Sequence, residues 1–139
     1  MTGKIFVDSN VLIYAHDEDA GVRQRRAAEW LEKLWESRTG CLSTQVMQEF
    51  YVNVTQKIKT RLSPGAAREI LRNYTPWVHA PLTALTVLRA SEIAEVWKLS
   101  FWDSMIVAAA EQEGAGELLT EDMNPGQVIA GVKILNPFL

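Results

Sequence analysis

Short apolar runs alternate with longer amphipathic stretches along this chain of 139 residues, and that alternation restricts its fold more than any other feature. The short runs predict buried strands at Lys4 to Val7, Cys41-Leu42, Trp77 to Ala80, Leu118-Leu119 and Val132 to Leu135. Strands separated by helices predict a parallel sheet with helices on both faces. We therefore expect one compact α/β domain that covers residues 1–139.

The stretches between these runs carry their apolar residues at helical spacing. Serine, threonine and proline at their starts are typical N-terminal helix signals. The expected helices are Val22 to Arg38, Ser43-Thr44 to Ile58, Ser63-Pro64 to about Asn73, Thr83 to Lys98, and Asp103 to Glu113. The last of these is apolar on nearly every side, which predicts a central helix that other elements cover.

The composition narrows the class of protein. Hydrophobic residues make up 47% of the chain and charged residues 22%, as in ordinary folded domains. One cysteine and two histidines argue against a Cys/His zinc site. The single Cys41 and the absence of a long apolar run before Asp8 or elsewhere favour a cytoplasmic protein without membrane attachment. The formal net charge of −3 argues against a general nucleic-acid coat but permits a local basic track.

Four acidic residues stand beside apolar runs that should be buried. Asp8 ends the first predicted strand, Glu49 lies within the run Val46 to Tyr51, Asp103 opens the apolar helix, and Asp122 follows a late strand. A carboxylate among core residues is costly unless something compensates its charge. If the four converge on one pocket, they form a hard, oxygen-rich site that suits Mg²⁺ or Mn²⁺.

The expected topology permits this convergence. Ligands of an open parallel sheet bind beyond the carboxyl ends of its strands, and Asp8 and Asp122 both follow predicted strands. The helix of Asp103 should start from the same rim, and Glu49 lies about one and a half turns into its helix, from where its side chain can reach back. Supporting roles, in which a side chain binds a carboxylate or a phosphate oxygen, are expected for Asn10, Ser9 and Thr120.

Each acidic residue also has a purely structural interpretation. The Asp8-Ser9-Asn10 segment could simply cap a helix, and Asp103 could be another N-cap. Asp122 precedes a Pro-Gly turn, and Glu49 could be a solvated helical residue. Four such placements at one predicted edge nevertheless favour the metal site.

Other polar residues are less informative. Basic residues form two clusters, one with Arg23, Arg25 and Arg26, the other with Lys57, Lys59, Arg61, Arg68 and Arg72. A solvated face is favoured over a phosphate-contacting track for both clusters. His16 and His79 are interpreted as surface or core histidines, and neither is expected to have an ionic partner.

Clustered carboxylates that bind a divalent cation are suited to phosphodiester hydrolysis. Such a cation lowers the pKa of a water molecule and polarises a phosphoryl oxygen, without an organic cofactor. The sequence has no GxxxxGK[ST] loop, and the Gly-Ala-Gly segment at 114–116 ends a helix instead of opening one. No serine or cysteine nucleophile has a credible histidine partner.

Four motifs, in order, resemble those of PIN-domain ribonucleases, and most closely those of VapC-type toxins of prokaryotic toxin–antitoxin pairs. They are Val7 to Leu12, Ser43 to Phe50, Phe101 to Ser104 and Thr120 to Met123, and the terminal Ile134 to Phe138 is also similar to the ending seen in this group. The resemblance covers nearly the full chain. It implies a three-layer α/β/α fold around a central parallel sheet, dependence on Mg²⁺ or Mn²⁺, and endonucleolytic cleavage of RNA.

The same resemblance implies roles and partners. Metal-binding and catalytic roles fall on Asp8, Glu49, Asp103 and Asp122, with Asn10 in support. A homodimer and a cognate antitoxin that covers the acidic pocket are also implied, whereas the RNA target does not transfer. Three alternatives stay open. One is a non-catalytic PIN-like module that binds RNA or protein. Another is a haloacid-dehalogenase-like phosphatase, which needs Asp where this chain has Asn10. The third is a phospho-receiver domain, which normally has a lysine just beyond a late strand. In this chain Lys133 precedes Ile134-Leu135 instead, so its position does not match.

Overall fold

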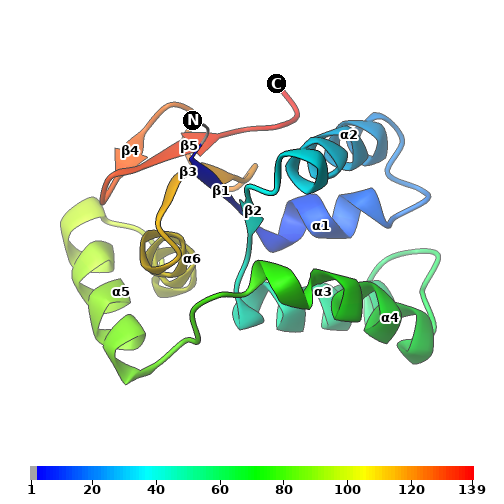
Figure 1. The fold of residues 1–139 in the computed structure, drawn as a ribbon, viewed down its shortest axis with the longest axis horizontal. Helices are drawn as coiled ribbons and strands as arrows, with labels where there is room; N and C mark the ends of the chain where they lie inside the picture. Colours follow the sequence, from blue (N-terminus) through cyan, green and yellow to red (C-terminus); the bar gives the residue numbers. More distant parts are fainter. Residues whose placement is uncertain (1–2) are drawn as a thin grey trace.

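The computed structural model describes residues 3–139, and Figure 1 shows how the helices and strands are arranged. In chain order they are β1 (Lys4–Val7), α1 (Ser9–Ala15), α2 (Val22–Ser37), β2 (Gly40–Cys41), α3 (Thr44–Gln56), α4 (Pro64–Tyr74), the 3₁₀ helix η1 (Thr75–Trp77), α5 (Ala84–Trp97), α6 (Phe101–Gln112), β3 (Ala115–Leu119), β4 (Val128–Ile129) and β5 (Val132–Leu135). The expected alternation of strands and helices is confirmed, although all of α3 to α6 lies between β2 and β3.

The strands form one five-stranded sheet in the order β2-β1-β3-β5-β4. β1 pairs in parallel with both β2 and β3, and β3 pairs in parallel with β5. Only β4 runs antiparallel to its neighbour β5. The carboxyl ends of β1 and β3 therefore meet at one edge, where Val7 lies opposite Leu119. Asp8 and Thr120 are the next residues of these two strands, so the backbone brings them side by side.

Helices cover both faces of the sheet, which confirms the three-layer α/β/α architecture. α6 packs on α5 and against β3 and β5, and it buries every residue from Ser104 to Ala110. On the other side α1 contacts α2 and α3, and α3 contacts α4. Figure 1 shows α5 and α6 at the lower left, below β4 and β5, and α1 to α4 on the right. The apolar run that predicts a covered helix is thus in the middle of the molecule.

Side-chain caps explain where the helices begin. Ser43 Oγ accepts the N–H of Val46 at the start of α3, and Ser63 Oγ accepts the N–H of Ala66 at the start of α4. Ser100 Oγ accepts the N–H of Asp103, so α6 begins two residues before Asp103. The interpretation of Asp103 as an N-cap is therefore wrong, because Asp103 lies in the first turn of a helix that Ser100 caps.

Two local expectations are wrong. Trp77 to Ala80 is not a strand: Trp77 ends η1, and the N–H groups of His79 and Ala80 donate to the Glu113 carboxylate at 2.9 and 2.7 Å. Glu113 also contacts the His79 ring, with 2.7 Å between Oε1 and Nδ1, so His79 does have an ionisable partner. The two-residue strand β4 was not expected.

A search of residues 3–139 finds no helix that combines the length and the apolar character needed to cross a bilayer.

Candidate active site

Asp8 connects the edge of the sheet to the first helix. Its N–H donates to Leu119 O at 3.0 Å, and its Oδ1 accepts the N–H of Ser9 at 2.7 Å, which caps α1. The capping interpretation of this residue is therefore correct, but it leaves the second carboxylate oxygen for other partners. Only 3% of Asp8 is exposed, and loss of solvent raises its pKa to about 7 despite the hydrogen bonds that it accepts.

Thr120 is the centre of a hydrogen-bond network around Asp8. Its hydroxyl donates to Asp8 Oδ2 at 2.8 Å and accepts the N–H of Asp122 at 3.1 Å. The amide nitrogen of Asn10 lies 3.1 Å from the same hydroxyl and donates to Asp122 Oδ2 at 3.0 Å. The network thus joins the start of α1 to the loop after β3, and it brings together two of the four acidic residues and two of the supporting residues.

Two further observations concern the supporting residues. The side-chain carbonyl oxygen of Asn10 is buried and has no hydrogen-bond donor among the described residues, although its amide nitrogen is fully engaged. An unpaired buried acceptor is unfavourable unless a ligand or cation meets it. Ser9 binds Asp8 through its backbone N–H, and no hydrogen bond of its hydroxyl occurs within residues 3–139.

Glu49 and Asp103 approach the same edge from two helices. Glu49 is half-buried on α3, and its charge helps to raise the pKa of Asp8. Asp103 is half-buried in the first turn of α6, where loss of solvent raises its pKa, the Ser100 hydroxyl lowers it, and the charge of Asp122 raises it. We call Asp8, Glu49, Asp103 and Asp122 the acidic rim, because the charges of these four residues act on one another.

The acidic rim has the right donors for a hard cation, but its side chains are not assembled into a coordination shell. No group of three or more His, Cys, Asp or Glu side chains among residues 3–139 is close enough to hold one ion. Carboxylate and amide oxygens are the ligands that Mg²⁺ and Mn²⁺ prefer. A cation would also relieve both the buried charge of Asp8 and the unpaired oxygen of Asn10. The donor chemistry of these residues therefore fits a divalent cation.

A cluster beside the acidic rim was missed by the sequence patterns. The guanidinium of Arg23 lies 5.7 Å from the ring centre of Tyr14 and 5.6 Å from that of Phe138. Its Nε is 3.4 Å from Glu121 Oε1, and Glu121 directly precedes Asp122. A hydrogen bond to Glu121 is the main reason why the pKa of Tyr14 rises to about 12. Tyr14 and Arg23 are more than 95 positions away from Glu121 and Phe138, so no local pattern could have grouped these residues.

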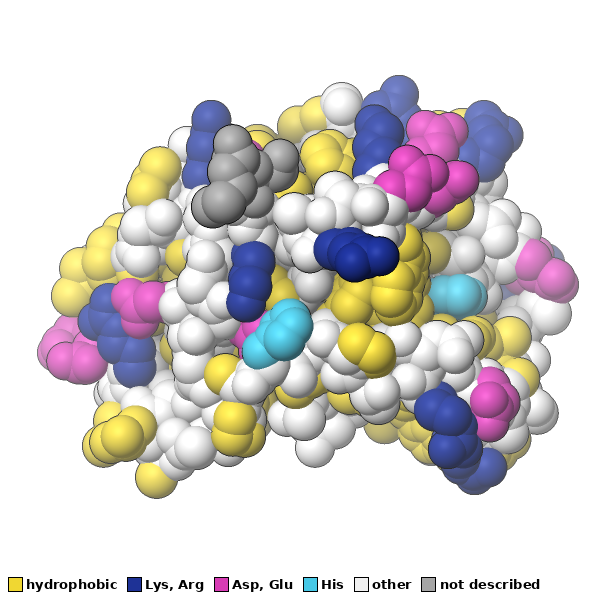
Figure 2. All heavy atoms as spheres, in the orientation of Figure 1, with side chains coloured by type: hydrophobic (Ala, Val, Ile, Leu, Met, Phe, Trp, Pro, Cys, Tyr) yellow, Lys and Arg dark blue, Asp and Glu magenta, His cyan; other side chains and the backbone are white. Residues whose placement is uncertain are grey.

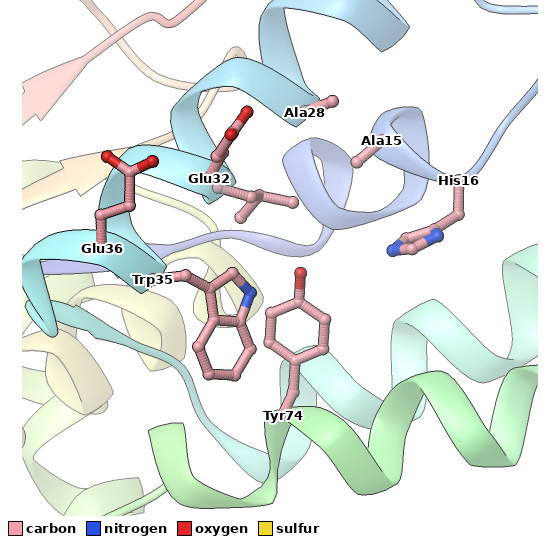
Figure 3. Close-up of a pocket in the computed structure, with 8 residues that line it drawn as sticks. Ala15, His16, Ala28, Glu32, Trp35, Glu36 and Tyr74 are labelled. Atoms are coloured by element: carbon pink, nitrogen blue, oxygen red, sulfur yellow. The ribbon is translucent and has the colours of Figure 1, made fainter.

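An open groove lies elsewhere. It has a volume of about 480 Å³ and lies between α1, α2 and α4, with Trp35 and Tyr74 directed into it (Figure 3). Glu32 and Glu36 stand along the α2 edge of the groove, and burial lowers the pKa of His16 at its far end. No residue of the acidic rim lines this groove, so it is separate from the candidate active site.

A family model for the PIN domain matches residues 5–128 of the chain, a range that contains the whole acidic rim. The chain belongs to the PIN domain family. No curated protein sequence matches this PIN domain closely enough to count as a relative.

Solved structures with a similar fold come from toxin–antitoxin systems. A chain of a toxin–antitoxin complex from Klebsiella pneumoniae has 20% identity and a TM-score of 0.66, over 97% of this PIN domain and 98% of that chain. A chain of DNA-bound VapBC from Salmonella typhimurium has 16% identity and a TM-score of 0.65, over 96% of this PIN domain and 97% of that chain. VapC20 of Mycobacterium tuberculosis, a toxin that cleaves the sarcin–ricin loop, has 22% identity and a TM-score of 0.58, over 83% of this PIN domain and 87% of that chain. At these identities the likeness establishes the shared fold.

Proposed function

We propose that this PIN domain is a Mg²⁺- or Mn²⁺-dependent endoribonuclease and the toxin of a type II toxin–antitoxin pair, with residues 1–139 acting as a single cytoplasmic nuclease domain. The observation that carries the proposal is the buried Asp8 carboxylate, which Thr120 and Asn10 connect to Asp122 at the carboxyl edge of a parallel sheet. A buried carboxylate whose pKa is raised and which lies beside other carboxylates marks a candidate functional site.

The residues of the acidic rim would divide the work of holding the cation. Asp8 and Asp103 are the proposed direct ligands, and Asp122 is a ligand or a partner through water. Glu49 is a ligand or orients the attacking water. When bound, the cation would lower the pKa of that water and stabilise charge on the phosphate. The exposed side chain of Asp122 and the half-exposed ones of Glu49 and Asp103 are free to change rotamer toward a shared ion.

Thr120 and Asn10 have supporting roles that follow from their contacts. The Thr120 hydroxyl donates to the Asp8 carboxylate and accepts the backbone N–H of Asp122, so it holds one carboxylate directly and the backbone of the other. The Asn10 amide donates to Asp122, and its own carbonyl oxygen, which is buried without a partner among residues 3–139, is the proposed further donor atom for a cation or a water. Ser9 supports Asp8 through its backbone N–H.

The proposed partners have separate support. The toxin assignment is supported by membership of the PIN family together with the fold shared with chains of toxin–antitoxin structures. The proposed antitoxin would cover the acidic rim. A homodimer is supported by α5, where Leu85, Leu88 and Val96 lie on one face and are 76%, 62% and 65% exposed.

A second candidate function is a non-catalytic PIN module that binds RNA or protein. It is favoured by one observation, the absence from residues 3–139 of three ligands gathered around one point. The two functions differ in their need for a divalent cation. A nuclease of this kind cleaves RNA with the cation and stops when the cation is removed, whereas a binding module cleaves no RNA in either condition.

The deciding experiment compares cleavage of end-labelled cellular RNA by four purified, antitoxin-free proteins. They are the native chain, Asp8→Asn, Asp103→Asn, and Glu69→Gln as a control on α4 that neutralises an exposed carboxylate paired with Arg72. We expect discrete cuts with Mn²⁺ by the native chain and by Glu69→Gln. We expect no cuts in EDTA, and a loss of at least 100-fold for the two rim variants, because each loses a charged ligand.

Folding and metal binding must be measured beside activity. Circular dichroism should show that both Asn variants fold, and Mn²⁺ should raise the melting temperature of the native chain. Cleavage that survives in folded Asp8→Asn and Asp103→Asn would exclude the proposed site. Metal binding without cleavage of any RNA would favour the binding module instead.

A further inference from the structure

We propose that Arg23 binds a backbone phosphate of the RNA strand beside the acidic rim and so positions that strand for cleavage. The inference rests on the proposed nuclease function, because it names a substrate-binding residue for the same site. It starts from an arginine that the fold holds firmly on one side and leaves open on the other.

The body of the Arg23 guanidinium is held by three neighbours. Tyr14 and Phe138 pack edge to face, with ring centres 5.3 Å apart, and the guanidinium lies over both rings. Glu121 meets only Nε, at 3.4 Å. A planar cation that is held in this way loses little further freedom when it binds an anion.

The two terminal nitrogens of Arg23 have no hydrogen-bond acceptor among residues 3–139, and 54% of the side chain is exposed. Arg89 shows the opposite arrangement, since its Nε and Nη2 donate to both oxygens of Glu111 at 2.8 and 2.9 Å. The Arg89 guanidinium is thus paired with a carboxylate of the fold, whereas the two terminal nitrogens of Arg23 form a fork that is available for a partner that accepts from both. Phosphate oxygens match that fork.

Arg23 lies beside the acidic rim, where an RNA strand would pass. Glu121 connects it to the acidic rim through the next residue, Asp122, and the charges of Arg23 and Asp122 both act on the Tyr14 hydroxyl. The chain has a net charge of −3 and concentrates four carboxylates at the rim, so the rim repels the flanking phosphates of an RNA strand. A cation at its border supplies the missing attraction.

The test compares Arg23→Gln and Arg23→Lys with Arg25→Gln. Arg25 is an exposed arginine of the same helix, two positions along the chain and therefore about 200° around the α2 axis from Arg23. The control substitution thus removes the same charge from another face of the helix. KM and kcat for a short single-stranded RNA are measured at several salt concentrations. Fluorescence anisotropy in an Asp103→Asn background, in EDTA, gives binding without cleavage.

We expect Arg23→Gln to raise KM and the dissociation constant roughly tenfold, with a smaller change in kcat. The slope of log affinity against log salt should fall by about 0.7, which corresponds to one phosphate contact of a single strand. Arg23→Lys should recover part of the affinity, since it keeps the charge and loses the fork. Arg25→Gln should stay within about twofold of the native chain.

The proposal is overturned if Arg23→Gln and Arg25→Gln weaken binding equally, or if neither changes the salt slope. Melting temperatures must accompany the data, because Arg23 also packs on Tyr14 and Phe138. If Arg23→Gln does not fold, Arg23→Lys decides through its salt slope, which should stay near the native value while its affinity falls. A native chain that cleaves no RNA refutes the proposed function separately, and the anisotropy measurement then decides whether Arg23 binds RNA at all.

Discussion

At the scale of single residues, Asp8 is the most unusual group in the molecule. It is nearly inaccessible to solvent, and its pKa of about 7 means that the metal-free folded chain holds a proton which the unfolded chain releases near pH 3.8. Between these two pH values the folded state binds more protons than the unfolded state. The free energy of unfolding therefore falls as the pH rises through this window.

Chemical denaturation of the metal-free chain between pH 5 and pH 8 should reveal this loss. We expect the contribution of Asp8 to the free energy of unfolding to fall by roughly 1.4 kcal/mol per pH unit up to about pH 7. Asp8→Asn cannot ionise at this position, so the difference between native chain and variant isolates the contribution of Asp8. A variant with the same pH dependence as the native chain would contradict the raised pKa.

Thr120 gives a second prediction at this scale. Thr120→Val keeps the shape of the side chain but removes the hydroxyl that contacts Asp8, Asn10 and Asp122. We expect Mn²⁺ affinity and RNA cleavage to fall roughly 10- to 100-fold, as for other residues that orient metal ligands. Calorimetric titration with Mn²⁺ measures the first quantity.

Thr55→Val is the control for this substitution, since the Thr55 hydroxyl donates to Tyr51 O within α3 and makes no other hydrogen bond with residues 3–139. Unchanged Mn²⁺ affinity in Thr120→Val would remove Thr120 from the site.

At the scale of elements, the start of α6 fixes the position of Asp103. Ser100→Ala removes the cap that accepts the Asp103 N–H and should lower the free energy of unfolding by about 1 kcal/mol. It should also lower kcat/KM roughly tenfold, because the first turn that carries Asp103 loses its anchor.

Ser63→Ala removes the corresponding cap of α4, which carries no residue of the acidic rim. Denaturant titration should show a similar loss of stability for both variants, and steady-state kinetics should separate them. Equal activity of the two capping variants would show that Asp103 does not depend on this cap.

Much of the fold follows from local patterns, because strands and caps leave signals in neighbouring residues. Asp8 could be placed at the carboxyl edge of the sheet because it follows a strand, and the strand ends of a parallel sheet share one edge. The segment Trp77 to Ala80 could not be assigned correctly. Its backbone N–H groups find their acceptor on Glu113, 34 positions away from His79, and no local pattern encodes that contact.

The same reason explains what was missed at the site. The Arg23 cluster depends on Tyr14, Glu121 and Phe138, which meet only after the chain has folded. The basic residues Arg23, Arg25 and Arg26 look alike in the sequence. Only their surroundings distinguish an arginine beside the acidic rim from its neighbours.

At the scale of the whole molecule, the side-chain classes are mixed on the face that Figure 2 shows. The outer face of α5 exposes three large apolar side chains, those of Leu85, Leu88 and Val96. We expect Leu88→Glu to convert the proposed homodimer to a monomer, since a carboxylate would be buried at the interface without a partner. Light scattering after size-exclusion chromatography measures the molar mass of the protein in solution and so separates a dimer from a monomer.

The control for the interface is Val128→Glu, which places the same charge on an apolar residue of β4 that is 56% exposed. This variant should keep the native mass. If Leu88→Glu remains a dimer, the interface lies on another face.

The contact between Thr120 and Asp8 spans 112 positions of the chain, and β1 pairs along its length with β3. A ribosome therefore adds more than a hundred residues after Asp8 before it makes the partner that holds this carboxylate. A message truncated before Thr120 yields fragments without an assembled acidic rim. The proposed nuclease thus has no complete site on the ribosome until β3 and the residues that follow it have been made.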